Sequence, residues 1–488
     1  MEQTTDTYYR AWLTRDARFD GRVFAGVRTT GIYCRPVCPA RMPRRENMTF
    51  FPTAAAAAEA GFRPCLRCRP EAAPDFAGWR GASPVVHRAL ALIEEGWLEE
   101  GDIDGLAGQV GVSGRQLRRL FREHLGATPV TVAQTRRVLL ARQLIHETSL
   151  SMADVAMASG FGSVRRFNET FHQLFDRPPH DLRRQRSASA AIGSGIAIRL
   201  PYRPPYDWDA MLATLARTAI AGVERIADGE YARTVRIGDH AGWVRVGPGM
   251  GDRLALTVHF PDLGALPRII GRVRRRFDLS ADPVAIASQL GEDSLLAPMV
   301  AARPGLRVPG IWDGFEEAVR ALTGNDSDLL AGIAETYGWP LDDVAVRAAG
   351  LSRTFPEPGD LAGMDTGNDR TVPGWIATPI AGLAAAVAGE PTLLAQHRDP
   401  AATRVRLRAI GGIDERLADG IVSRVLEGYD AIPLDRWCAP RGDPSVPLAD
   451  LSRDWSPWRA YGFAHLLVDR YPTERSIVSS SEETSHVN

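Results

Sequence analysis

Four of the five cysteines lie in two close pairs, a pattern that suits metal binding. Three residues separate Cys34 from Cys38, two separate Cys65 from Cys68, and 26 residues lie between the pairs. Four sulfurs brought together in this way form the tetrahedral site that Zn²⁺ prefers. Disulfides are disfavoured because the N-terminus lacks the basic and apolar stretches of a secretory signal. We therefore predict one Zn²⁺ held by all four cysteines.

The predicted zinc site has two possible roles. Four thiolates on one Zn²⁺ leave the site doubly negative, so each sulfur stays electron-rich. An exposed sulfur of this kind can accept a methyl group from an electrophile. An enclosed site would only hold a small domain together. The spacing alone leaves both interpretations open.

A resemblance bears on this choice. The segments VFAGVRTTGIYCRPVCPAR, RRENMTFF and AGFRPCLRCRP resemble the metal-binding domain of the Ada alkylation-response family, over about residues 8 to 70. The resemblance implies that Cys34, the first cysteine of CRPVC, accepts a methyl group from a methylphosphotriester in DNA. It also implies that Arg41 binds the DNA backbone. In that family the transfer is irreversible, so each chain would act once.

Helical spacing of apolar residues follows from about residue 103 to residue 186. Segments 103–110 and 113–124 are expected to form one helix pair, and a long helix is expected at 131–147. Ser151, with Asp154 as its capping partner, begins a second pair, whose last helix turns Val164, Phe167 and Phe171 inward. The residues expected to face outward are Arg115, Gln116, Arg118, Arg119, Arg122, Arg165, Arg166 and Asn168.

Two helix-turn-helix units of this kind could enter successive major grooves of DNA, about 34 Å apart. The alternative is a plain helical bundle with solvated arginines. The distribution of charge favours the DNA-binding interpretation modestly. Residues 1–195 hold 27 Arg against 20 acidic residues, whereas the rest of the chain holds 31 Arg against 39 acidic residues. The segments DIDGLAGQVGVSGRQLRRLFREHLGATP and SMADVAMASGFGSVRRFNETFHQLFDRPPHDLR resemble the AraC-type DNA-binding domain over residues 85 to 186.

Past the flexible basic segment 183–195, the pattern changes to strands and then to helices. Alternating residues from 231 to 260, with Gly-rich turns between them, predict an antiparallel meander. Helical patterns punctuated by Gly and Pro return from Pro283 onward. We expect a small mixed-sheet domain followed by a helical domain.

This half resembles the AlkA-type 3-methyladenine DNA glycosylases over about residues 198 to 470, through LPYRPPYDWDAMLATLARTAIAGVE, EYARTVRI and ARPGLRVPGIWDGFEEAVRAL. The resemblance implies a helix-hairpin-helix at 407–421, where Gly411 and Gly412 would let backbone N–H groups approach phosphate. It also implies Asp435 as the carboxylate that supports glycosidic cleavage. All 58 basic residues are Arg, so a lysine-based lyase step is excluded.

The sequence also departs from this family. The hairpin reads GGID, Arg416 and Gly420 replace aromatics of the base pocket, and TGNDSD stands in place of the usual wedge segment. Weaker stacking on the extruded base follows from these changes. A catalytically inactive glycosylase-like domain that still binds DNA is therefore the alternative, and Cys438 is interpreted as a bystander thiol.

Together these features predict a multidomain α+β protein. It would join a small zinc-binding module, an all-α AraC-type double helix-turn-helix, a small mixed α/β domain and an all-α helix-hairpin-helix glycosylase domain. The expected divisions are 1–75 (zinc and methyl acceptor), 84–186 (helix-turn-helix), 187–196 (linker), 197–281 (AlkA N-terminal-like sheet), 282–475 (glycosylase-like) and 476–488 (disordered tail).

The expected function is a response to DNA alkylation. The protein would transfer a methyl group to Cys34, activate transcription and excise alkylated purines of the 3-methyladenine type. The alternative is a transcriptional regulator with structural zinc and an inactive C-terminal domain. Expected partners are damaged and operator duplex DNA and RNA polymerase, with no membrane, and the chain is expected to be a cytoplasmic monomer.

Overall fold

The computed structural model describes residues 2–74, 83–94, 96–183, 195–367, 371–395, 398–427, 430 and 452–470. Contacts divide the chain into two compact units. The first unit contains Met1–Tyr202 and Gly249–Gly271, and the second contains Arg203–Pro248 and Arg272–Asn488. No helix of the described residues is both long and apolar enough to cross a membrane.

The first unit begins with a small four-stranded sheet, in the order β3-β1-β2-β4. Its elements are α1 (Glu2–Leu13), β1 (Phe24–Val27), β2 (Ile32–Cys34), β3 (Met48–Phe51), α2 (Ala54–Glu59), β4 (Arg63–Pro64) and the short helix η3 (Pro70–Ala72). Strand β2 runs antiparallel to β1 and parallel to β4, with Tyr33 opposite Pro64. This parallel pairing brings Cys34, at the end of β2, toward Cys65, which directly follows β4.

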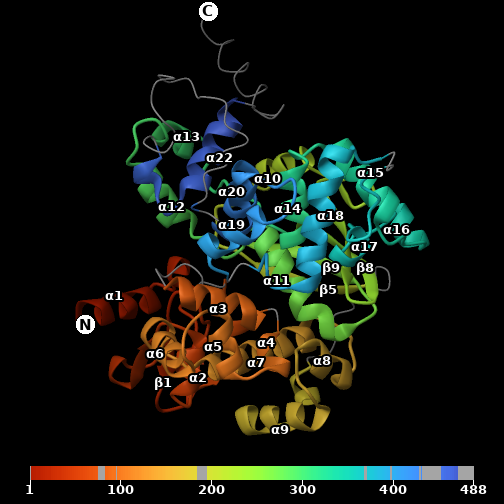
Figure 1. Ribbon diagram of the computed structural model, residues 1–488. Coiled ribbons are helices and arrows are strands. Elements are labelled where there is room, and N and C mark those ends of the chain that lie inside the picture. Colours follow the sequence, from red (N-terminus) through yellow and green to blue (C-terminus); the bar gives the residue numbers. More distant parts are fainter. Residues whose placement is uncertain are drawn as a thin grey trace, which may run out of the picture. The chain divides into compact units, whose positions relative to one another are not determined.

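Helices form the rest of the N-terminal region, in red to gold in Figure 1. They are α3 (Pro84–Glu94), α4 (Trp97–Glu100), α5 (Ile103–Gln109), α6 (Gly114–Leu125), α7 (Pro129–Glu147), α8 (Met152–Ala158) and α9 (Val164–Phe175). Gly111, at φ +76°, makes the turn between α5 and α6. Ser151 and Asp154 form the predicted capping box of α8. The two predicted helix pairs are confirmed.

The inward face of α9 differs from the prediction at one residue. Phe167 and Phe171 are fully buried, as expected, but Val164 is 40% exposed. Val164 directly follows the N-cap residue Ser163. The buried stripe of α9 therefore consists of Phe167, Phe171 and Phe175.

Two further strands belong to the first unit. Strand β5 (Ile196–Pro201) pairs antiparallel with β9 (Arg253–His259). The C-terminal part of α7 contacts β5 through side chains: Gln143 donates to the carbonyl of Arg199 (2.6 Å), and the Arg199 N–H donates to Glu147 (2.9 Å). Helix α7 therefore holds β5 in place through these two hydrogen bonds.

The second unit contains the three antiparallel strands β6 (Glu224–Ala227), β7 (Glu230–Ile237) and β8 (His240–Pro248). Strand β7 pairs antiparallel with both neighbours, so the meander predicted from residue 231 onward is confirmed over β7 and β8. Helix α10 (Trp208–Ala216) precedes the strands, and its N-cap Asp207 accepts a hydrogen bond from the N–H of Ala210.

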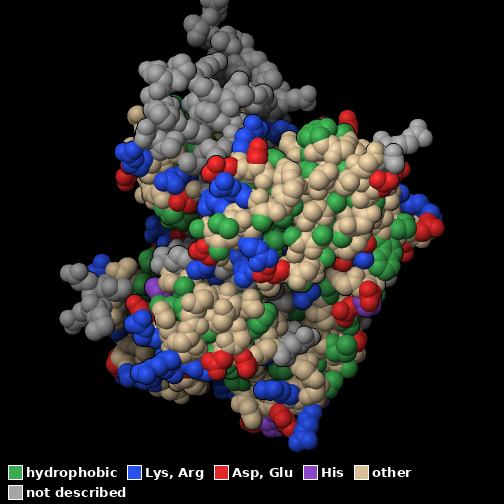
Figure 2. All heavy atoms as spheres, viewed as in Figure 1, with side chains coloured by type: hydrophobic (Ala, Val, Ile, Leu, Met, Phe, Trp, Pro, Cys, Tyr) green, Lys and Arg blue, Asp and Glu red, His purple; other side chains and the backbone are tan. Residues whose placement is uncertain are grey.

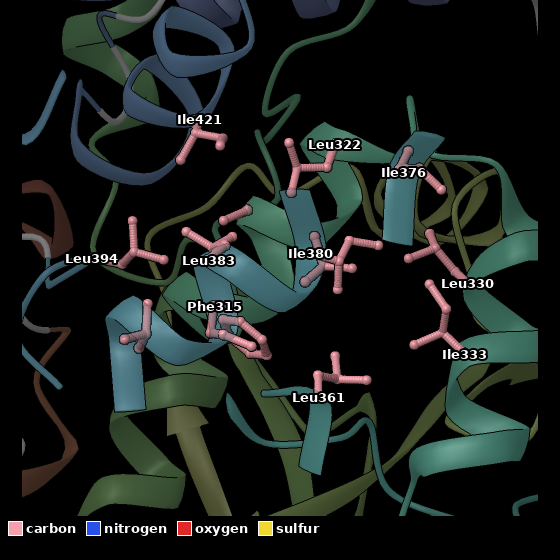
Figure 3. Close-up of a cluster of buried hydrophobic side chains, with 14 of the residues drawn as sticks. Phe315, Leu322, Leu330, Ile333, Leu361, Ile376, Ile380, Leu383, Leu394 and Ile421 are labelled. Atoms are coloured by element: carbon pink, nitrogen blue, oxygen red, sulfur yellow. The ribbon is translucent and has the colours of Figure 1, made fainter. Parts of the chain in front are cut away.

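The remaining α-helices of the described residues are α11 (Leu266–Arg276), which begins in the first unit, α12 (Pro283–Leu290), α13 (Ala297–Ala302), α14 (Gly314–Leu322), α15 (Ser327–Tyr337), α16 (Val344–Ala348), α17 (Pro358–Leu361), α18 (Gly374–Gly389), α19 (Pro400–Arg408), α20 (Glu415–Val422) and α22 (Arg459–Arg470). Figure 3 shows their core, in which Phe315 of α14, Leu383 of α18 and Ile421 of α20 belong to one buried cluster. This packing positions the α19–α20 hairpin.

A buried cluster of ion pairs connects the strands of the second unit to its helices. Glu224 of β6 accepts from Arg233 (3.0 Å), Arg276 (2.9 Å) and Arg320 (2.6 Å). Burial opposes ionisation of Glu224, but the charges of Arg320, Arg233 and Arg276 lower its pKa well below the usual range. Glu224 is therefore a carboxylate in the folded protein, although it is only 4% exposed.

Candidate metal centre and nucleic-acid interface

The four predicted ligands come together in the first unit. The sulfur atoms of Cys34, Cys38, Cys65 and Cys68 all lie within 4.8 Å of one another. The N–H of Arg35 donates to the sulfur of Cys68, and the N–H of Arg67 donates to the sulfur of Cys65, both at 3.4 Å. Backbone donors of this kind stabilise negatively charged sulfur. The cluster therefore has the donor set and the spacing that a single Zn²⁺ requires.

The sulfurs strongly affect one another's ionisation. Contact with Cys38, then with Cys65 and Cys68, raises the pKa of Cys34, whereas contact with Cys34 lowers the pKa of Cys65. Contact with Cys34 also lowers the pKa of Cys38 to about 7. Thiols this close share protons, because several adjacent negative charges repel. A divalent cation would hold all four as thiolates.

The four cysteines differ in exposure. Cys38, Cys65 and Cys68 are buried, at 8%, 5% and 7% exposure, whereas Cys34 is partly exposed. Cys34 is the last residue of β2, so its side chain lies where the strand enters the CRPVC loop. Cys34 is therefore the most exposed residue of the four.

Arg35 clamps the two cysteine loops together. Its side chain pairs with Asp20, with Nε donating to Oδ1 at 2.7 Å, and both side chains are 9% exposed. The Nη1 group of Arg35 donates to the carbonyls of Cys68 (3.1 Å) and Arg69 (3.2 Å). The residue directly after Cys34 therefore fixes the loop that carries Cys68. Sequence analysis missed this role, although the position of Arg35 between two ligands was a usable signal.

Exposed basic side chains lie on both predicted recognition helices. On α6 the exposed residues are Arg115, Gln116, Arg118, Arg119 and Arg122, and on α9 they are Arg165, Arg166 and Asn168. Arg41 is also exposed, three residues after Cys38. Figure 2 shows basic side chains over α9 with acidic ones beside them. One such pair is Arg165 with Glu169, whose Oε1 accepts from Nε at 2.8 Å.

The predicted hairpin lies between α19 and α20. Gly411 and Gly412 are exposed, and Gly412 has φ +83° with Pro379 of α18 packed against it. A side chain at Gly412 would be both strained and crowded, so glycine is required there. Asp414 caps α20 by accepting from the N–H of Leu417 at 2.8 Å, which places a carboxylate beside the glycines.

The second unit also contains a cavity of about 220 Å³. It is lined by parts of α10, α14 and α22, and by the 306–311 segment. The carboxylate in its lining is Glu317, which lies 3.5 Å from Arg424. The predicted catalytic Asp435 and the bystander Cys438 lie outside the described residues.

Three family models match the chain. The metal-binding domain of Ada matches residues 7–71, a helix-turn-helix domain matches residues 106–185, and the AlkA N-terminal domain matches residues 197–313. The metal-binding match coincides with the four-cysteine cluster. Together they identify a single Zn²⁺ site and confirm the predicted cofactor.

Similar proteins cover the chain as a whole and in its parts. A probable bifunctional transcriptional activator/DNA repair enzyme AlkA of Mycobacterium tuberculosis is 37% identical over 98% of this chain and 100% of its own length. DNA-3-methyladenine glycosylase 2 of Escherichia coli is 30% identical over 55% of this chain and 95% of its own length. The bifunctional transcriptional activator/DNA repair enzyme Ada of Escherichia coli is 35% identical over 34% of this chain and 47% of its own length.

Proposed function

Because this chain belongs to the family of bifunctional transcriptional activator/DNA repair enzymes, we propose that it responds to DNA alkylation. In this response, Cys34 accepts a methyl group from a methylphosphotriester in DNA. The observation that carries the proposal is the partial exposure of Cys34 in an otherwise buried cluster of four sulfurs. The same observation disfavours a purely structural zinc site, since such a site has no need of an accessible sulfur.

The transfer is a single displacement at carbon. The Cys34 sulfur attacks the methyl carbon, an S–C bond forms and the C–O bond to the phosphotriester breaks. The electron pair of that bond stays on oxygen, so the phosphotriester becomes an ordinary phosphodiester anion. Zinc, when bound, keeps the cysteines deprotonated at neutral pH. Arg35 holds the two cysteine loops in register, and Arg41 is proposed to bind the backbone beside the reacting phosphate.

Methylation also changes the affinity for DNA. The thioether is neutral, so the cluster loses one negative charge and repels phosphate less. Repair therefore strengthens DNA binding and makes the repaired protein a transcriptional activator. We propose that operator contacts come from the exposed residues of α6 and α9, namely Arg115, Gln116, Arg118, Arg119, Arg165, Arg166 and Asn168.

Transfer of an isotopic label tests this function. The zinc-loaded chain is incubated with duplex DNA carrying labelled methylphosphotriesters, and the label on the protein is counted. We expect about one methyl group per wild-type chain and none on Cys34→Ser. The fifth cysteine supplies the matched control, because Cys438→Ser should accept as much label as wild type. Equal labelling of wild type and Cys34→Ser would contradict the proposal.

A second function is favoured by the near-complete coverage of the Escherichia coli glycosylase. We propose that the second unit excises alkylated purines of the 3-methyladenine type, with Asp435 stabilising the cationic sugar of the transition state. Gly411 and Gly412 are proposed to approach the DNA backbone near the extruded base. The chain has no Lys, so the base is removed and the strand is left intact.

Release of methylated base separates this function from its alternative. Wild type should release 3-methyladenine from methylated duplex DNA, and Asp435→Asn should lose most of that release. Asp443→Asn removes a carboxylate from the same segment and should release base at the wild-type rate. No release by wild type would leave a regulator with an inactive glycosylase-like domain.

The division of the chain is also part of the proposal. We place an acceptor module at 1–75, the helix-turn-helix region at 84–186, a linker at 187–196, the sheet domain at 197–281, the glycosylase-like domain at 282–475 and a tail at 476–488. The matches to the three family models support this order. The activator role implies contact with RNA polymerase, and we place the protein in the cytoplasm as a monomer.

A further inference from the structure

Arg142 is a buried cation in the middle of the helix-turn-helix region. It belongs to α7, and its side chain is 0% exposed. A guanidinium in such a position is costly unless other groups compensate its charge and its N–H donors. Its contacts therefore show which elements depend on it.

The groups that compensate its charge, and that accept from Nη2, come from the metal-binding module. Arg142 Nη1 lies 3.1 Å from the carboxylate of Glu71, a residue of η3 that is itself buried. Arg142 Nη2 donates to the carbonyl oxygen of Cys65, one of the four metal ligands, at 3.2 Å. Glu71 also accepts from Arg69, which directly follows the ligand Cys68. One side chain of α7 thus holds both ends of the second cysteine loop.

The same guanidinium also contacts the second recognition helix, α9. Its central carbon lies 5.4 Å from the ring centroid of Phe175, in the range of a cation–π contact. Phe175 is the last residue of α9 and is 2% exposed. Arg142 is therefore in direct contact with a metal ligand on one side and with the end of a recognition helix on the other.

The first recognition helix is connected to the metal-binding module by different residues. Thr53 Oγ1, at the start of α2, donates to the carbonyl of Leu125 at the end of α6 (2.7 Å). The N–H of Thr128 donates to Glu59 of α2 (2.6 Å). These contacts involve neither the cysteine loops nor Arg142. The two helix-turn-helix units can therefore respond differently to a change at the metal centre.

We propose that Arg142 is a positioning residue that transmits the state of the cysteine–zinc centre to α9, and not to α6. A change in the Cys65–Cys68 loop alters the Cys65 carbonyl and Glu71, and the buried guanidinium cannot lose these partners without a large cost. It moves with them and displaces the ring of Phe175. The inference rests on the proposed function for its biological meaning, which is that methylation at Cys34 is reported to the operator through α9.

Hydrogen exchange of the zinc-loaded full chain tests the selectivity of this path. Arg142→Met retains the length of the side chain and removes its charge and donors. We expect about tenfold faster exchange in residues 164–175, with residues 114–125 unchanged. Arg136→Met is the matched control, since Arg136 also lies in α7 but pairs with Glu94 of α3. Equal acceleration of both recognition helices, or none in residues 164–175, would overturn the proposal.

Zinc release to a chromogenic chelator tests the reverse direction, because coupling between two sites is reciprocal. Phe175→Leu and Phe167→Leu both remove a buried ring from α9, but the ring in contact with Arg142 is that of Phe175. We expect about threefold faster zinc release from Phe175→Leu than from Phe167→Leu. Identical release rates would refute the path. This outcome is independent of labelling at Cys34, which tests the proposed function alone.

Discussion

The four cysteines of the cluster differ in exposure and in hydrogen bonding. Cys38, Cys65 and Cys68 are buried, and backbone N–H groups donate to the sulfurs of Cys65 and Cys68, while Cys34 is partly exposed. A buried thiolate with donors around it is stabilised as a ligand, whereas an exposed electron-rich thiolate can react. Arg35 connects the first cysteine loop to the second through the carbonyl of Cys68, and Asp20 pairs with the guanidinium of Arg35.

The Arg35–Asp20 pair gives a prediction at this scale. Asp20→Asn leaves the buried guanidinium of Arg35 without its carboxylate, a change that typically costs about 3–5 kcal/mol. We expect a loss of this size in the free energy of unfolding of the metal-binding module, and faster zinc release, measured by urea titration and by a chelator. Asp16→Asn removes a carboxylate from an exposed pair with Arg18 and is the control. Equal stability of the two variants would contradict the role given to Arg35.

Among the elements, α9 carries an exposed arginine that is already paired with an acidic side chain. The side chain of Arg165 on α9 is 87% exposed but is already paired with Glu169. DNA phosphate must compete with this carboxylate and is also repelled by it. In the proposed operator complex, this pair therefore lowers the affinity that α9 contributes.

Removing that carboxylate should strengthen DNA binding. We expect Glu169→Ala to bind duplex DNA about threefold more tightly at low salt, and to show a steeper dependence of affinity on salt. Fluorescence anisotropy at several salt concentrations measures both quantities. Asp239→Ala removes an exposed acidic residue from the turn between β7 and β8 and should leave binding unchanged. Weaker binding by Glu169→Ala would mean that the pair positions Arg165 for DNA.

Helix α22 contributes a pH dependence through His465. Burial, and then the charge of Arg303, lowers the pKa of His465 to about 4, whereas an unfolded chain has a value of about 6.5. Between these values the unfolded chain binds a proton that the folded chain does not, so stability falls as the pH decreases from about 6.5 to about 4.

The size of this effect can be measured against a variant without the imidazole. Urea unfolding at pH 7 and pH 5 should show that wild type loses about 2 kcal/mol more stability than His465→Gln over this interval. The variant retains every other titrating group, so the difference isolates His465. Parallel losses in the two proteins would show that His465 is protonated equally in the folded and unfolded chains.

Local patterns made the metal ligands and the recognition helices predictable from the sequence. Cysteine spacing, the Ser151–Asp154 capping box and the Gly111 turn each act within a few residues. Arg142 was not predictable, because helical patterns assign arginine to solvent and its partner Cys65 lies 77 residues away. The buried carboxylate Glu224 was missed for the same reason, since its partner Arg320 is 96 residues away. Asp435 remains a prediction from resemblance.

At the scale of the whole molecule, the chain divides its chemistry between two units. All four zinc ligands belong to the first unit. Residues 1–195 also carry the excess of arginine, and the remainder is acidic. Electrostatic attraction to DNA, metal binding and the proposed methyl transfer are therefore concentrated in one part of the chain. The proposed base excision belongs to the other part.

Metal removal should reveal this division. Zinc binding contributes directly to the stability of the unit that holds the ligands. In scanning calorimetry we expect two transitions, of which excess chelator lowers one and leaves the other in place. Calorimetry of a variant with Cys38 and Cys68 replaced by Ser should match the chelated wild type. A single transition, or an equal shift of both, would contradict the division of the chain between the two units.

The central claim is that the methyl group goes to Cys34. The zinc-loaded chain is treated with DNA containing methylphosphotriesters, digested with trypsin, and its peptides are fragmented in the mass spectrometer. Residues 29–41 form one peptide that contains both Cys34 and Cys38, because Pro36 blocks cleavage after Arg35. We predict that this peptide gains the mass of one methyl group and that its fragment ions place the group on Cys34. A methyl group on Cys38, Cys65 or Cys68 would contradict the account.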